Sequence, residues 1–188
     1  MDSWEKLKND CSNCRRCSLA DSRHNLVFGV GNVNAEVMFI GEGPGEQEDL
    51  QGEPFVGPAG KLLDTMLEII DLDRSKVYIA NMIKCRPPRN RDPLVVEEEA
   101  CAEWLRRQIA LIRPKIIVCL GRIAAMGIIR EDFKITREHG QWFERGDIKY
   151  IATYHPSALL RDPSKRPDAF EDLIELRRGI RALCERTY

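Results

Sequence analysis

The chain has 188 residues, of which 43% are hydrophobic, and a formal net charge of −1 at pH 7. This size and composition predict one domain, spanning residues 1–188, with a single sizeable core, and we expect a monomer. The balanced charge excludes a protein that clamps nucleic acid over its whole surface, so any DNA contact has to be local.

Membrane and export signals are not evident in the sequence. No run approaches the roughly 18 consecutive apolar residues that a membrane span requires. The N-terminus, MDSWEKLKND, is polar and acidic where a signal peptide would be basic and then apolar. The sequence therefore predicts a soluble, cytoplasmic protein with no membrane partner.

Four short runs rich in β-branched residues predict strands at residues 36–41, 76–83, 115–121 and 149–155. Apolar residues recur at helical spacing in three other segments, namely Leu62, Leu63, Met66, Ile69 and Ile70; Cys101, Leu105, Ile109 and Ile112; and, in a final helix from about Pro167, Phe170, Leu173, Leu176, Ile180 and Leu183. Strands that alternate with helices indicate an α/β fold, with three αβα layers around a central four-stranded, mainly parallel sheet.

Polar and special residues are concentrated directly after the predicted strands. The four strands lead into GEGPGEQED, NMIKCRPPRNRDP, GRIAA and HPSALLR. Ligands bind at the carboxyl ends of the strands in such a sheet, so these segments are expected to form one site. The first turn is glycine-rich but acidic, which argues against a phosphate cradle.

Seven cysteines in a chain without an export signal indicate reduced thiols or metal ligands more readily than disulfides. Cys11, Cys14 and Cys17 form two overlapping C-x-x-C pairs, whereas Cys85 and Cys101 flank a loop rich in proline and arginine. Four thiolates can hold zinc or a four-iron, four-sulfur cluster, and the spacing alone leaves both open.

Four motifs occur in order along the chain: GEGPGEQED, PFVGPAG, ANMIKCRPPRNRDP and YHPSALLR. Together with Cys14, Cys17, Cys85 and Cys101, they resemble the family 4 uracil-DNA glycosylases over most of the chain. The resemblance implies a DNA repair hydrolase that flips uracil out of single- or double-stranded DNA and cleaves its N-glycosidic bond, which starts base excision repair. It also implies a structural 4Fe-4S cluster on these four cysteines, without Cys11.

The resemblance further implies which residues bind the uracil. Phe55 stacks on the flipped base, and the amide of Asn81 accepts from uracil N3–H and donates to O4. From the residues alone, Phe55 is equally a core side chain, and Asn81 could serve a structural network in its apolar strand. The backbone N–H of Gly43 is expected to donate to the base, and Glu48 is expected to guard the C5 edge of the base against thymine.

Two residues are expected to carry the chemistry. His155 donates to the uracil O2 region and stabilises the developing anion, although a lone histidine is more often structural. Glu42 is expected to stabilise the cationic sugar and to orient the attacking water, because a carboxylate near the sugar can do both. The family lacks the aspartate or asparagine with which other superfamily members position water in this motif.

Contacts with DNA are expected on both sides of this pocket. By the same match, Leu159 is the apolar wedge that fills the space left by the flipped base. Basic residues that are expected to bind phosphates are Lys84, Arg86, Arg89 and Arg91 in the loop after the second strand, and Arg161, Lys165 and Arg166 after the histidine motif.

Two other classes of protein could share some of these features. One is an electron-transfer protein with a nucleotide on the glycine turn, but that turn has no G-x-G-x-x-G and no Walker lysine. The other is a non-catalytic or covalent uracil-DNA binder. The covalent relatives carry an added basic loop that ends in histidine, where this chain has RPPRNRDP.

Overall fold

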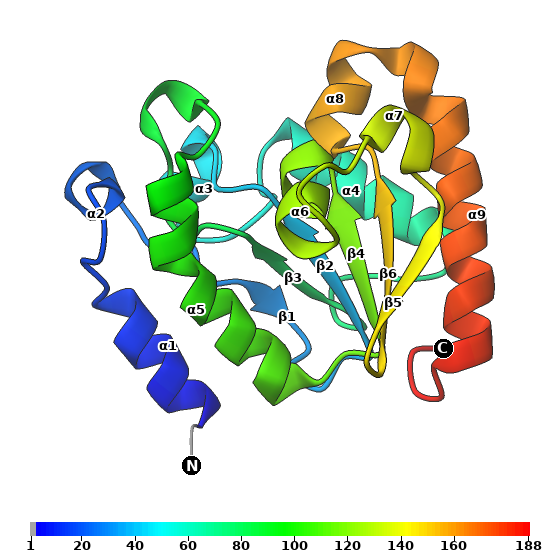
Figure 1. The fold of residues 1–188 in the computed structure, drawn as a ribbon, viewed down its shortest axis with the longest axis horizontal. Helices are drawn as coiled ribbons and strands as arrows, with labels where there is room; N and C mark the ends of the chain where they lie inside the picture. The colour runs from blue at the N-terminus through cyan, green and yellow to red at the C-terminus, as the bar shows by residue number, and fades with distance from the viewer. Residues whose placement is uncertain (1–2) are drawn as a thin grey trace.

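A mixed sheet lies between two layers of helices in the computed structural model, which describes residues 3–188 (Figure 1). In the described residues the sheet has six strands in the order β1-β3-β2-β4-β6-β5. The strands are β1 (Val30–Gly31), β2 (Val37–Gly41), β3 (Tyr78–Asn81), β4 (Ile116–Leu120), β5 (Trp142–Arg145) and β6 (Ile148–Thr153).

The helices are α1 (Trp4–Ser12), α2 (Leu19–Ser22), α3 (Glu46–Gln51), α4 (Pro58–Ile69), α5 (Val95–Ile112), α6 (Arg122–Ile128), α7 (Ile135–Glu138), α8 (Pro156–Arg161) and α9 (Arg166–Leu183). Short 3-10 turns cover Pro88–Asn90 and Pro163–Lys165. No helix of residues 3–188 is both long enough and apolar enough to cross a membrane.

The four predicted strands are confirmed as β3, β2, β4 and β6, which lie side by side and parallel. The predicted count of four is wrong, because an antiparallel strand is added at each edge. β1 has only two residues, too few to show a pattern. β5 is half-exposed and joins β6 through a tight turn at Gly146, whose φ is +60°.

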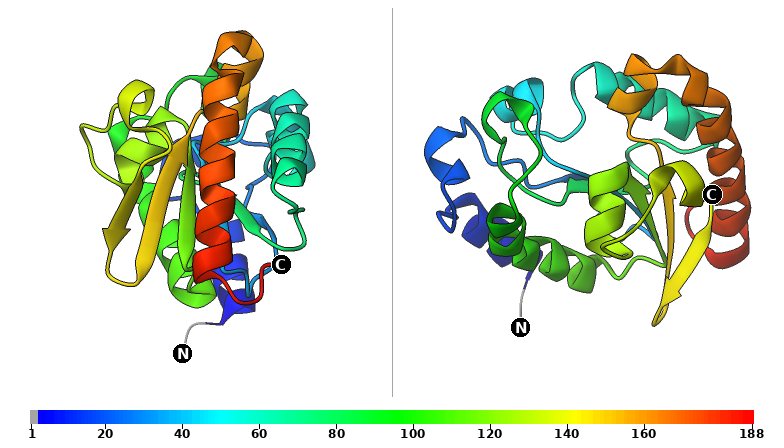
Figure 2. Two further views of the ribbon diagram at one scale, coloured as in Figure 1. Left: turned by 90° about the vertical axis from the view of Figure 1, so that its right-hand side faces the viewer. Right: turned by 45° about the horizontal axis from the view of Figure 1, so that its top comes forward.

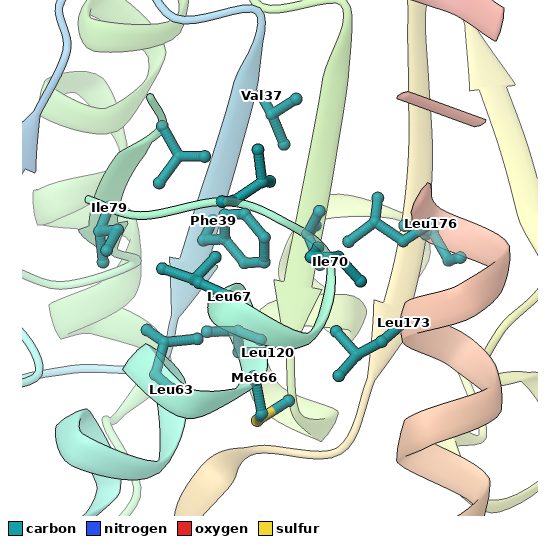
Figure 3. Close-up of a cluster of buried hydrophobic side chains, with 14 of the residues drawn as sticks. Val37, Phe39, Leu63, Met66, Leu67, Ile70, Ile79, Leu120, Leu173 and Leu176 are labelled. Carbon is teal, nitrogen blue, oxygen red and sulfur yellow. The ribbon is translucent and has the colours of Figure 1, made fainter. Parts of the chain in front are cut away.

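Both faces of the sheet are buried, as parallel sheets require. Along β2, Val37 and Phe39 pack with α4 and α9, whereas Met38 and Ile40 pack with α5 and α6. Figure 2 shows α4 and α6 on opposite sides of the strands, and Figure 3 shows side chains of β2, α4 and α9 filling the first cluster. Burying each such Leu or Phe side chain stabilises the fold by about 1.5–3 kcal/mol.

The buried side of α9 differs from the predicted one. Leu173, Leu176 and Ile180 are buried, whereas Phe170 and Leu183 are 49% and 37% exposed, so the predicted apolar side is buried only in part. Asp172 instead shares the buried side with Leu173, because its carboxylate accepts hydrogen bonds from Thr153 Oγ1 at 2.6 Å and contacts His139 Nδ1 at 2.8 Å. Paired in this way, an acid can occupy a core position.

Residues after α9 return to the start of the sheet. The buried carboxylate of Glu36, next to β2, accepts hydrogen bonds from the backbone N–H of Glu185 and Arg186 and from Thr187 Oγ1. Lys115 Nζ lies 3.0 Å from the same carboxylate. The tail is therefore fixed to the first central strand by a buried charge.

Candidate active site and cysteine cluster

A cavity of about 470 Å³ opens at the carboxyl ends of the parallel strands. It lies where the chain switches direction, since β3 and β4 flank β2 on opposite sides. All six residues predicted to bind uracil line it, namely Glu42, Gly43, Glu48, Phe55, Asn81 and His155. The strand ends therefore line one cavity, as expected, and their binding of uracil stays a prediction.

Asn81, the last residue of β3, is 2% exposed. Its side-chain Oδ1 is buried and accepts no hydrogen bond from any described residue. A Cβ on Gly41 would lie 2.5 Å from this oxygen and 2.6 Å from Phe55 Cζ, so only glycine lets the amide and the ring approach so closely. Because an unpaired buried acceptor costs about 1–3 kcal/mol, Asn81 Oδ1 marks a place for an external donor.

Phe55 is held in a strained conformation beside His155. Its φ is +54°, in the left-handed region that non-glycine residues rarely adopt. The carboxylate of Glu48 fixes the following turn by accepting from the backbone N–H of Val56 at 2.9 Å and of Gly57 at 3.0 Å. The ring centroids of Phe55 and His155 are 5.6 Å apart, with the planes inclined by 28°.

The carboxylates of Glu48 and Asp49 both accept hydrogen bonds from backbone N–H groups of other segments. Asp49 is 1% exposed and accepts from the backbone N–H of His24 at 2.9 Å. Glu48 also lines the cavity. Its contact with the C5 edge of a base stays a prediction.

His155 lies just after β6 in a fixed orientation. Its Nδ1 accepts from the backbone N–H of Ser157 at 3.1 Å, which leaves the ring proton on Nε2. Burial, and then the positive charge of Arg161, lower the pKa of His155 to about 4. At neutral pH the cavity therefore contains an uncharged imidazole with one N–H donor.

Glu42 follows β2 and is half-buried in the cavity wall. Burial, and then the negative charge of Asp92, raise the pKa of Glu42 to about 7. A carboxyl group that titrates near neutrality can accept a proton from water at physiological pH, as a general base does.

The comparisons with known proteins agree with this geometry. A family model described as "Uracil DNA glycosylase superfamily" matches residues 28–176. The chain belongs to this superfamily. It is 47% identical to the type-4 uracil-DNA glycosylase of Archaeoglobus fulgidus over 94% of this chain and 92% of that protein.

Two further relatives place the chain within the superfamily. It is 42% identical to the type-4 uracil-DNA glycosylase of Thermotoga maritima, over 89% of this chain and 90% of the relative. Identity to the type-5 uracil-DNA glycosylase of Pyrobaculum aerophilum is 30%, over 83% of each chain. The resemblance to family 4 uracil-DNA glycosylases is confirmed.

The basic residues predicted to bind DNA have different surroundings in this glycosylase fold. Arg161 and Arg91 line the cavity, but both terminal nitrogens of Arg91 bind the buried carboxylate of Glu97. Arg89 is exposed, and Arg86 lies 3.7 Å from Glu46. Arg122, which was not among the predicted basic residues, also lines the cavity and directly follows the third predicted strand.

The structure contradicts the wedge role predicted for Leu159. Its side chain is 2% exposed and belongs to the core cluster under α4 and α9. Leu160, the next residue of α8, is 42% exposed. The helix turns one leucine inward and presents the other, which the motif HPSALLR does not reveal.

The four predicted ligand cysteines come together in space. Cys14, Cys17, Cys85 and Cys101 line one small cavity beside α5, and Cys11 is buried outside it. No group of three or more His, Cys, Asp or Glu within residues 3–188 is arranged to hold a single metal ion. Four thiols from three segments line this one cavity, and four thiolates are the number that a 4Fe-4S cluster takes.

Hydrogen-bond donors are aimed at three of these sulfur atoms. Trp104 Nε1 lies 3.3 Å from Cys14 Sγ, Arg23 Nη1 lies 3.2 Å from Cys85 Sγ, and the backbone N–H of Lys84 lies 3.2 Å from Cys101 Sγ. Such N–H donors stabilise and tune cluster thiolates, so the residues present fit a 4Fe-4S group.

Proposed function

We propose that this protein excises uracil from DNA by hydrolysing the N-glycosidic bond, as the first step of base excision repair. Membership of the superfamily and the names of the type-4 relatives support this function. The single observation that carries it is Asn81 Oδ1, an unpaired acceptor inside the cavity that suits the N3–H donor of uracil.

Binding of uracil follows from the groups around Asn81. The amide Nδ2 donates to O4 while Oδ1 accepts from N3–H. Cytosine presents an acceptor at N3 and a donor at N4, so both pairs would be mismatched. The ring of Phe55 offers a stacking surface to the flipped base. Gly43 lines the cavity, so its backbone N–H can donate to the base.

The chemical step breaks the bond between the sugar C1′ and uracil N1. The electron pair leaves with the base, so negative charge grows on uracil while positive charge grows on the sugar. The imidazole of His155 is already neutral at pH 7, and its Nε2–H donates a hydrogen bond to the anion. Glu42, as a carboxylate, stabilises the sugar cation and accepts the proton of the water that adds to C1′.

The cofactor of this proposal is a 4Fe-4S cluster on Cys14, Cys17, Cys85 and Cys101. When bound, it supplies a cross-link between the N-terminal segment and α5 rather than chemistry in the cavity. Purified without oxygen, the protein should be brown, and Cys85→Ser should lose iron and thermal stability together. Stoichiometric zinc without iron would contradict this assignment.

The partner is uracil-containing DNA, held through its phosphates by basic residues at the cavity. Arg161 and Lys165 line the cavity on one side, and Arg122 lines it on another. Replacing Arg161 with Gln should reduce the salt slope of DNA binding by about one phosphate contact. An unchanged slope would remove Arg161 from the interface. We also propose that the protein is cytoplasmic and monomeric. Size-exclusion chromatography with light scattering tests the oligomeric state.

The deciding experiment is incubation with a single-stranded oligonucleotide that contains one uracil. Free uracil together with an abasic site is the expected result. A stable covalent complex would instead indicate a covalent uracil-DNA binder, and no reaction at all would exclude both a glycosylase and a covalent binder. An oligonucleotide with cytosine at the same position is the matched control.

A further inference from the structure

Lys84 is the one fully buried lysine of the described residues, at 0% exposure, three positions after Asn81. The expectation that it binds DNA phosphates is wrong, because its side chain points into the protein. An amine removed from water requires hydrogen-bond partners. Its partners connect the uracil cavity with the cysteine cavity.

The first partner is the main chain of Asn81. Lys84 Nζ donates to the carbonyl oxygen of Asn81 at 2.9 Å. The N–H of the same peptide unit, that of Met82, donates to Gly41 O at 2.9 Å. β1 pairs with β3 only at Tyr78 and Ile79, so the lysine amine occupies the side of Asn81 that the short edge strand leaves open.

The second partner holds the amine itself. Lys84 Nζ donates to Gln108 Oε1 at 2.7 Å, and Gln108 is also fully buried in α5. Gln108 Nε2 donates in turn to Phe28 O at 2.9 Å and to the hydroxyl of Tyr78 at 3.2 Å. Because each member is bonded to the next, the amine has little freedom to move.

The backbone of Lys84 reaches the other cavity. Its N–H lies 3.2 Å from Cys101 Sγ, and its carbonyl accepts from the N–H of Val27 at 2.8 Å. One residue thus contacts a cysteine of the proposed cluster with its main chain and the peptide of Asn81 with its side chain.

We propose that Lys84 is a positioning residue for uracil recognition, which clamps the Asn81 peptide so that the amide meets the N3 and O4 edge of the base. This inference rests on the proposed function and deepens it. A shift of about 1 Å in a group that orients substrate can slow a reaction on the order of 100-fold, so a clamp on this peptide is felt in the rate. The alternative is a lysine that serves only to stabilise the cysteine region.

A double-mutant cycle separates the two roles. The variants are Lys84→Met, which keeps the length of the side chain, Asn81→Ala, and the pair together. The measurements are single-turnover cleavage of the uracil oligonucleotide, affinity for free uracil, iron per chain and melting temperature. Lys115→Met is the control, because Lys115 also binds a buried partner, Glu36, but lies away from the cavity.

We expect Lys84→Met to slow cleavage roughly 10- to 100-fold and to weaken free-uracil binding, with DNA affinity unchanged. In the Asn81→Ala background the same change should alter the rate by less than about twofold, since the amide it positions is gone. Lys115→Met should lower the melting temperature without changing the rate.

The inference would be overturned if the rate reduction in the double variant equalled the product of the two single reductions. Normal binding of free uracil by Lys84→Met would also overturn it. If Lys84→Met loses iron, the Gln108→Met variant is used instead. It removes one hydrogen-bond partner of the Lys84 amine and leaves Lys84 itself in place. Its effect on the rate should likewise be non-additive with that of Asn81→Ala. A wild-type protein that releases no uracil refutes the proposed function itself, whereas multiplying rates in an active protein refute only the role of Lys84.

Discussion

Glu42→Gln is expected to make the protein more stable at alkaline pH while it abolishes most activity. The pKa of Glu42 is raised from 4.5 to about 7 by burial and by Asp92, so its ionised form is disfavoured in the folded state. In the unfolded chain, Glu42 ionises at its ordinary pKa of 4.5. Stability that is present in acid is therefore lost as pH rises from about 4.5 to about 7, and the glutamine variant avoids this loss.

The size of the effect follows from the shift. At about 1.4 kcal/mol per pKa unit, the full shift would correspond to roughly 3 kcal/mol. Glu42 is only half-buried, and screening by water reduces this to about 1–2 kcal/mol. A difference of 1 kcal/mol moves the melting temperature of a chain of this size by about 2–4 °C.

The assay is thermal unfolding of wild type and Glu42→Gln without oxygen, at pH 5 and at pH 8. The gap between the two melting temperatures should widen by several degrees from pH 5 to pH 8. Glu171→Gln, at an exposed position of α9, is the matched control and should show no such change. A gap that is independent of pH would mean that the Glu42 carboxylate is not disfavoured in the cavity.

Three further variants test individual residues of the site. His155→Ala should slow single-turnover cleavage by about two orders of magnitude with little change in DNA affinity, and a normal rate would make His155 structural. Asn81→Asp should lose most uracil cleavage and shift the residual activity relatively toward cytosine, so an unchanged uracil rate would make Asn81 a core residue. Leu160→Ala should weaken activity on double-stranded more than on single-stranded substrate, because only the exposed leucine of α8 can enter a duplex; equal losses would exclude a wedge there.

Local sequence patterns were sufficient for the centre of the sheet and for the place of the site. Strands β2, β3, β4 and β6 are continuous apolar runs, and parallel strands bring their carboxyl ends to one edge whatever the details of packing. Asn81 was recognisable because a polar amide interrupts such a run. Its unpaired oxygen could not be foreseen, since that depends on which side chains of other segments surround it.

Apart from the number of strands, the predictions that failed concern the direction in which a side chain points. Lys84 and Leu159 belong to types usually read as surface and wedge residues, yet both are buried by contacts with distant helices. Asp172 lies on the buried side of α9 because its carboxylate contacts Thr153 of β6 and His139 next to α7. Tertiary contacts of this kind leave no periodic signal, so a single sequence does not contain them in readable form.

The contact between Glu36 and the tail sets an order of events during synthesis. Glu36 precedes the first central strand, whereas residues 185–187 are added by the ribosome after every strand of the sheet. Until they emerge, the Glu36 carboxylate lacks these three donors and keeps only its contact with Lys115. A nascent chain that pairs β2 with its neighbours early therefore leaves this carboxylate without those donors until residues 185–187 have left the ribosome.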